Sequence, residues 1–126
     1  MNFPDSATPV AFVNVGDRDR ALGFYRDTLG LALRSSDPFG DFLEFGPALV
    51  RMTVLPDYKA GQHPVIGWNV DDIAAAVDAL RGRGVEMTIY EGMGQDERGV
   101  WTAPDGKAKV AFFADPDGNM LSLAQV

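Results

Sequence analysis

Two carboxylates and one carboxamide lie close together near the C-terminus, in the stretch DPDGNMLSL that spans residues 115–123. Their oxygens are the ligands that a hard divalent cation prefers, so the cluster is a candidate metal site. The same residue types also form tight turns, because Pro fixes φ, Gly reaches positive φ, and Asp and Asn bond to nearby backbone groups. Strand-like sequence lies on both sides, and we therefore predict a turn over residues 115–119 rather than a cation site.

Arg51 and Glu91 are the other side chains that could carry chemistry. Arg51 stands between apolar residues, and a cation that faces inward needs a partner. A bound carboxylate or phosphate would supply one through a bidentate pair. The alternative is that Arg51 points to solvent or pairs with Glu44 on the neighbouring strand. Glu91 is the candidate general base if it faces inward, although carboxylates at strand ends are usually solvated.

Composition excludes several classes of function. The 126 residues fit one domain with its own core. A net charge of -7 argues against a nucleic-acid partner, because a phosphate-binding surface needs an excess of Lys and Arg. Cys is absent, which excludes disulfides, thiolate metal sites and Cys nucleophiles. We see no secretion signal and no apolar run near the ~20 residues that cross a bilayer, and we expect a cytoplasmic protein.

The elements that would position these residues occur twice. In the first half, a β-rich stretch over residues 10–15 precedes Asp17, which is placed to cap a helix that ends at Gly30. In the second half, residues 65–70 precede Asp71 and Asp72, and the helix ends at Gly84. Another strand is expected to start by Leu33, and further strands are expected at residues 41–45, 49–55, 88–91, 100–103, 109–114 and 119–124. The order β-α-β-β-β therefore occurs twice, with a period of about 55 residues.

Three stretches, VNVGDRDRALGFYRDTLGL, WNVDDIAAAVDALRGRGVEM and FFADPDGNMLSLAQ, resemble the vicinal oxygen chelate superfamily. This superfamily includes glyoxalase I, extradiol dioxygenases, methylmalonyl-CoA epimerase, and the fosfomycin and bleomycin resistance proteins. The resemblance implies an α+β fold in which two βαβββ modules pair curved mixed sheets around a cavity, with the helices outside. It places module one at about 8–57, a linker at 56–64 and module two at about 65–126, all within one domain that forms a homodimer.

The resemblance also indicates where metal-using relatives place their ligands, which are typically His or Gln, Glu, His and Glu. The matching positions here hold Val10, Arg51, Val65 and Ser122, and none of these is a usual ligand of a divalent metal. A two-residue slip would direct His63 inward, but one His in a linker would lack partners. We therefore predict neither a metal nor another cofactor.

Period-two alternation then supplies the lining of the cavity. Residues of the opposite parity, such as Val13, Ile66 and Leu121, should pack under the helices. Trp101 and Tyr90 flank a Gly-rich loop, from which either could stack on a ligand. The predicted ligand-binding residues are Phe12, Asn14, Arg51, Asn69, Trp101 and Ser122.

Two functions are compatible with these residues. The first is a metal-independent protein that binds a small organic molecule with an anionic or carbonyl end, similar to the bleomycin-resistance branch. The second is a lyase or isomerase that acts on a small carbonyl or carboxylate metabolite, with Arg51 positioning an anionic substrate and Glu91 as acid or base.

Overall fold

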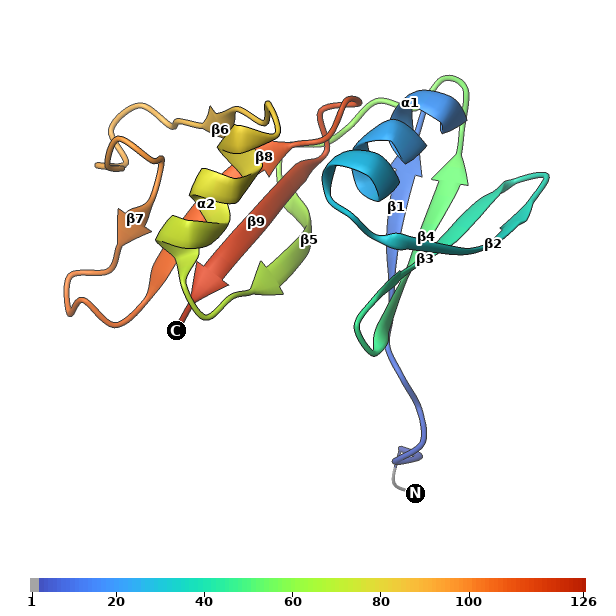
Figure 1. The fold of residues 1–126 in the computed structure, drawn as a ribbon, viewed down its shortest axis with the longest axis horizontal. Coiled ribbons are helices and arrows are strands. Elements are labelled where there is room, and N and C mark those ends of the chain that lie inside the picture. Colours follow the sequence, from blue (N-terminus) through green and yellow to red (C-terminus); the bar gives the residue numbers. More distant parts are fainter. Residues whose placement is uncertain (1–2) are drawn as a thin grey trace. The chain divides into compact units, whose positions relative to one another are not determined.

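The computed structural model describes residues 3–126, and the chain divides into two compact units, one ending at Tyr58 and the other beginning at Lys59. Each unit contains one mixed β-sheet and one helical segment that follows its first strand (Figure 1). The order of elements is β-α-β-β-β in the first unit, and the second unit has the same order with one additional two-residue strand, β7. The predicted α+β class with two related modules is confirmed, and the second module has one strand more than the predicted βαβββ.

The first unit has a four-stranded sheet in the order β1-β4-β3-β2, with β1 and β4 parallel and the other pairs antiparallel. Its elements are β1 (Val10–Val15), α1 (Arg18–Leu22), the π-helix η1 (Gly23–Thr28), β2 (Ala32–Asp37), β3 (Gly40–Phe45) and β4 (Ala48–Val54).

Asp17 caps α1 as predicted, because its carboxylate accepts a hydrogen bond of 2.9 Å from the Arg20 N–H. The helical segment then widens, and the Leu29 N–H donates to the Phe24 carbonyl five residues earlier at 2.8 Å. Gly30 follows with φ +82°, in the left-handed region where helices commonly end.

The second unit has the strand order β5-β9-β8-β6, and β7 also pairs with β8. Its elements are β5 (Pro64–Asn69), α2 (Ile73–Gly82), β6 (Met87–Thr88), β7 (Trp101–Thr102), β8 (Lys109–Ala114) and β9 (Met120–Gln125). Asp72 caps α2 through a hydrogen bond of 3.0 Å from the Ala75 N–H. No helix within residues 3–126 is long and apolar enough to span a membrane.

Strands β6 and β7 are shorter than the sequence predicted. The Gln95 carboxamide binds the backbone at the end of β6 and in the segment that follows, accepting from the Tyr90 N–H at 2.7 Å and donating to the carbonyls of Thr88 and Gly99. These bonds hold the chain in turns where a longer strand was expected, and Gly99 adopts φ +81° there.

Alternation of burial along the strands is as predicted. Val13, Ile66, Leu121 and Leu123 are buried, and half-buried Trp68 stacks on buried Phe113 with the ring centroids 6.3 Å apart. The remaining parity of each sheet forms a face that we call the open face of that unit. Exposed Phe12 and Asn14 belong to the open face of the first unit, and exposed Asn69 belongs to that of the second.

Candidate ligand-binding site

The open face of the first unit carries a row of three large side chains on neighbouring strands. Arg51 of β4 lies opposite Phe12 of β1 and Phe42 of β3. Asn14 belongs to the next row, opposite Thr53. Phe12 is 68% exposed. Three of the predicted binding residues, Phe12, Asn14 and Arg51, therefore share one face.

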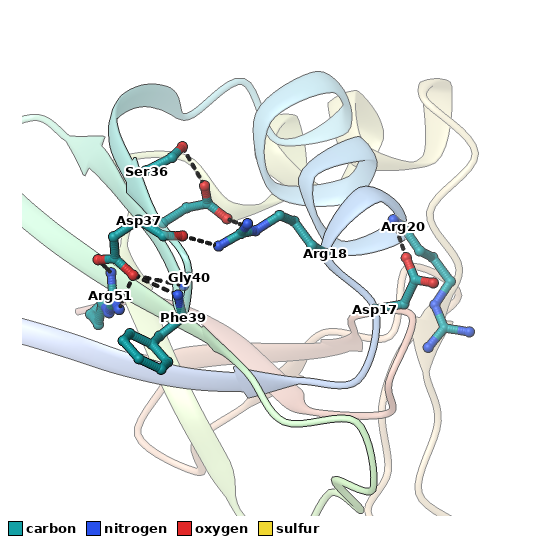
Figure 2. A network of polar contacts seen from close by, with 9 residues as sticks. Asp17, Arg18, Arg20, Ser36, Asp37, Phe39, Gly40 and Arg51 are labelled. Atoms are coloured by element: carbon teal, nitrogen blue, oxygen red, sulfur yellow. Dashed lines mark hydrogen bonds and ion pairs between the residues drawn. The ribbon is translucent and has the colours of Figure 1, made fainter.

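The Arg51 guanidinium has a carboxylate partner within its own unit (Figure 2). Its two terminal nitrogens donate to the two Asp37 carboxylate oxygens at 2.7 and 3.1 Å, a bidentate pair. The guanidinium carbon also lies 4.8 Å from the centroid of the Phe42 ring. The Arg51 side chain is only 13% exposed. It neither points into solvent nor pairs with Glu44, which lies 3.6 Å from Arg34 instead.

Asp37 is the residue of this site that the sequence-based prediction missed. It begins the turn Asp-Pro-Phe-Gly between β2 and β3, and its carboxylate also accepts from the Phe39 N–H at 2.7 Å and the Gly40 N–H at 3.1 Å. Figure 2 shows these bonds and the contact of the Arg18 guanidinium with the Asp37 carbonyl. An Asp before Pro with Gly three residues later is a typical signal of such a turn, and this signal could have identified Asp37.

The pair makes stability depend on pH in a defined window. Hydrogen bonds from Arg51 and from the Phe39 backbone lower the pKa of Asp37 from 3.8 to about 2. Because the folded-state pKa is depressed, the stabilisation is present above about pH 4 and is lost as pH falls toward 2. In urea unfolding, the difference in free energy of unfolding between the wild-type protein and Asp37→Asn should shrink as pH falls through this window. A gap that stays constant from pH 6 to pH 2 would contradict the assignment.

The open face of the second unit holds the other three predicted binding residues. Ser122 of β9 lies between Gly67 of β5 and Phe112 of β8. The next row joins Asn69, Ala124, Val110 and Trp101. The Tyr90 ring meets the Phe112 ring edge to face at 5.5 Å.

The four family metal positions are occupied by side chains with no usual metal donor. Val10 pairs with Leu49 on the open face of the first unit, and Arg51 is bonded to Asp37. Val65 lies at a register shift between Pro64 and Ile66, so simple alternation does not fix its direction. Within residues 3–126, no group of three or more His, Asp or Glu side chains could hold a metal ion.

The remaining candidates lie outside the sheets. Glu91 is exposed in the turn that follows β6, and His63 is exposed in the bend that precedes β5. Neither is a member of the paired rows on the open faces, so the role of Glu91 as acid or base stays a prediction.

The cluster at residues 115–119 is the turn that the sequence predicted. One carboxylate oxygen of Asp115 accepts from the N–H groups of Asp117 and Asn119 at 2.9 Å each. Its other oxygen accepts from the Asn119 side-chain amide at 2.8 Å, and Gly118 adopts φ +86°. Turn chemistry therefore accounts for the acidic cluster.

Comparison with known proteins agrees with this architecture. The family model of the Glyoxalase/Bleomycin resistance protein/Dioxygenase superfamily matches residues 7–123, and the chain belongs to this superfamily. A probable lactoylglutathione lyase of Vibrio cholerae is 30% identical over 129 residues, which covers 90% of this chain and 86% of the relative.

Two solved structures show the same fold. The glyoxalase/bleomycin resistance protein/dioxygenase from Alicyclobacillus acidocaldarius has a TM-score of 0.73 at 19% identity and covers 95% of this chain and 91% of that chain. TnmS3, an antibiotic binding protein from Streptomyces sp. CB03234, has a TM-score of 0.69 at 24% identity, covering 98% of both chains.

Proposed function

We propose that the chain is a metal-independent small-molecule-binding protein of the glyoxalase/bleomycin-resistance type. One observation carries the proposal: the family metal positions hold Val10, Arg51, Val65 and Ser122, and the only ionic group among them is already bonded to Asp37. Two alkyl groups, a paired cation and a hydroxyl do not fit a divalent metal, so we derive no chemistry through one.

The open faces support binding. They combine exposed or half-buried aromatic side chains, among them Phe12, Phe112 and Trp101, with the hydrogen-bonding groups of Asn14, Asn69 and Ser122. Apolar walls with a few polar groups are typical of sites for small organic ligands. The antibiotic-binding role given for TnmS3 is a precedent on the same fold. That the two sheets enclose a common cavity stays a prediction, as do the homodimer, the cytoplasmic location and the absence of a nucleic-acid partner.

The second candidate function is that of a lyase or isomerase. It is favoured by the relative from Vibrio cholerae, whose name is probable lactoylglutathione lyase and which is 30% identical. In this case Glu91 would act as acid or base on a small carbonyl or carboxylate metabolite. Product formation from such a compound, lost in Glu91→Gln, would favour this candidate over sequestration.

Removal of metal tests the first candidate directly. Protein purified without chelator should contain no stoichiometric divalent ion by elemental analysis. Treatment with EDTA should leave its Tm unchanged, because the positions that would hold the ion offer no adequate donors. A stoichiometric ion, or a fall in Tm with EDTA that added zinc reverses, would refute metal independence.

A further inference from the structure

Gly67 leaves a notch over Ser122 on the open face of the second unit. A Cβ atom at Gly67 would lie 2.7 Å from the Ser122 hydroxyl oxygen, closer than real Cβ contacts allow. Gly67 and Ser122 are direct partners in the pairing of β5 with β9. The missing side chain therefore keeps the hydroxyl accessible from the open face, and any larger residue at this position would cover it.

The polar groups at the notch are without partners. Among the described residues, the Ser122 hydroxyl and the Asn69 side-chain amide take part in no side-chain hydrogen bond. Ser122 is half-buried, and Asn69 lies two residues from Gly67 on the same strand. A ligand group bound here would therefore gain hydrogen bonds without displacing any protein partner.

The surroundings of the notch are uncharged. The paired open-face positions around Ser122 are Gly67, Asn69, Ala124, Val110, Phe112 and Thr88, and none of these residues ionises near neutral pH. An anionic ligand would meet no unmatched cation among these residues, and its desolvation would be uncompensated.

We propose that the notch formed by Gly67 and Ser122 is the polar subsite for an uncharged, flat ligand that carries a carbonyl or hydroxyl group. This inference rests on the proposed binding function and specifies its ligand class. The Ser122 hydroxyl donates to the carbonyl or accepts from the hydroxyl, and the Asn69 amide offers a second bond. The Phe112 ring, backed edge to face by Tyr90 at 5.5 Å, and the Trp101 ring provide aromatic surface for the flat part.

A matched series of naphthalene derivatives tests the charge and the place of binding. Naphthamide, naphthol and naphthoate share one ring system and differ in a single substituent that is neutral in the first two and anionic in the third. In NMR titrations of nitrogen-labelled protein, naphthamide and naphthol should shift the backbone amides of Gly67 and Ser122. Naphthoate should bind at least about tenfold more weakly than naphthamide, because its charge finds no partner there.

Two variants locate the interaction. Ser122→Ala should weaken naphthamide binding about 3- to 10-fold, the effect of one net hydrogen bond. Gly67→Ala should weaken it about tenfold or more by filling the notch. Gly82→Ala is the matched control, because a Cβ there meets nothing within 4 Å, and it should leave the Kd unchanged.

The outcomes separate this inference from the proposed function. Two results would overturn the neutral subsite while leaving a binding protein. One is tighter binding of naphthoate than of naphthamide, and the other is a set of amide shifts at Arg51 that persists in Ser122→Ala. Turnover of a probe would overturn sequestration and leave the subsite intact if Ser122→Ala still weakens binding. If no member of the series shifts Gly67 or Ser122, the inferred subsite is wrong.

Discussion

Gly40→Ala is expected to lower the free energy of unfolding by about 3 kcal/mol or more, because the protein has no space for a Cβ atom at this position. The added atom would lie 2.0 Å from the Met52 carbonyl oxygen and 3.0 Å from the Thr53 Cα, both of them backbone atoms. Rotamer changes cannot relieve a clash with backbone, so β3 and β4 must separate or shift. Gly40 pairs directly with Thr53 in this ladder.

The same substitution should disturb the candidate site. The Gly40 N–H donates to the Asp37 carboxylate at 3.1 Å, and that carboxylate holds the Arg51 guanidinium. Urea unfolding followed by circular dichroism measures the loss of stability. Gly82→Ala is again the control: Ala favours the end of α2, and its free energy of unfolding should be unchanged or slightly raised. Equal stability of Gly40→Ala and wild type would contradict the close approach of the two strands.

Features that depend on local pattern were predictable from the sequence. The β-branched and aromatic residues of Val10–Val15 and Lys109–Ala114 gave strands with the predicted bounds. Asp17 and Asp72 cap helices because an Asp before an amphipathic run can accept from an otherwise unpaired backbone N–H. Alternation then assigned each side chain of a regular strand to the helix-covered or the open face.

Features that depend on one long-range partner were not predictable in the same way. The partner of Arg51 is fixed by the Asp-Pro-Phe-Gly turn, which brings Asp37 within 2.7 Å, whereas the sequence offered a bound anion, solvent or Glu44 as alternatives. The ends of β6 depend on the Gln95 side chain, which no period in the sequence reveals. At Val65 a register shift interrupts the alternation on which the prediction relied.

The internal repeat gives the two open faces different chemistry. When Val10 is aligned with Val65, Phe12 and Gly67 occupy equivalent positions of the repeat, as do Asn14 and Asn69. In the first unit the resulting row is filled by Phe12, a paired Arg51 and Phe42, whereas the equivalent row of the second unit leaves the Gly67 notch. We therefore expect the neutral polar contacts of a ligand to lie on the open face of the second module rather than on the filled row of the first.

Arg18→Ala should destabilise the protein by about 2 kcal/mol, because it leaves a buried carboxylate without its cation. The Asp41 side chain is 1% exposed, and it accepts from the Arg18 Nε at 3.2 Å and from the Ser36 hydroxyl at 2.5 Å. These bonds join the first residue of α1 to β2 and β3. Full loss of a buried pair costs about 3–5 kcal/mol, and we expect less here because Arg18 is 34% exposed and water can partly replace it.

A double-mutant cycle with Asp41→Asn isolates the pair from other effects of truncation. The cost of Arg18→Ala should fall by about 1 kcal/mol or more in the Asp41→Asn background, because the neutral amide does not need the cation. Arg26→Ala is the control, since Arg26 pairs with its exposed neighbour Asp27 and such pairs contribute little. Additive effects of Arg18→Ala and Asp41→Asn would contradict the coupling.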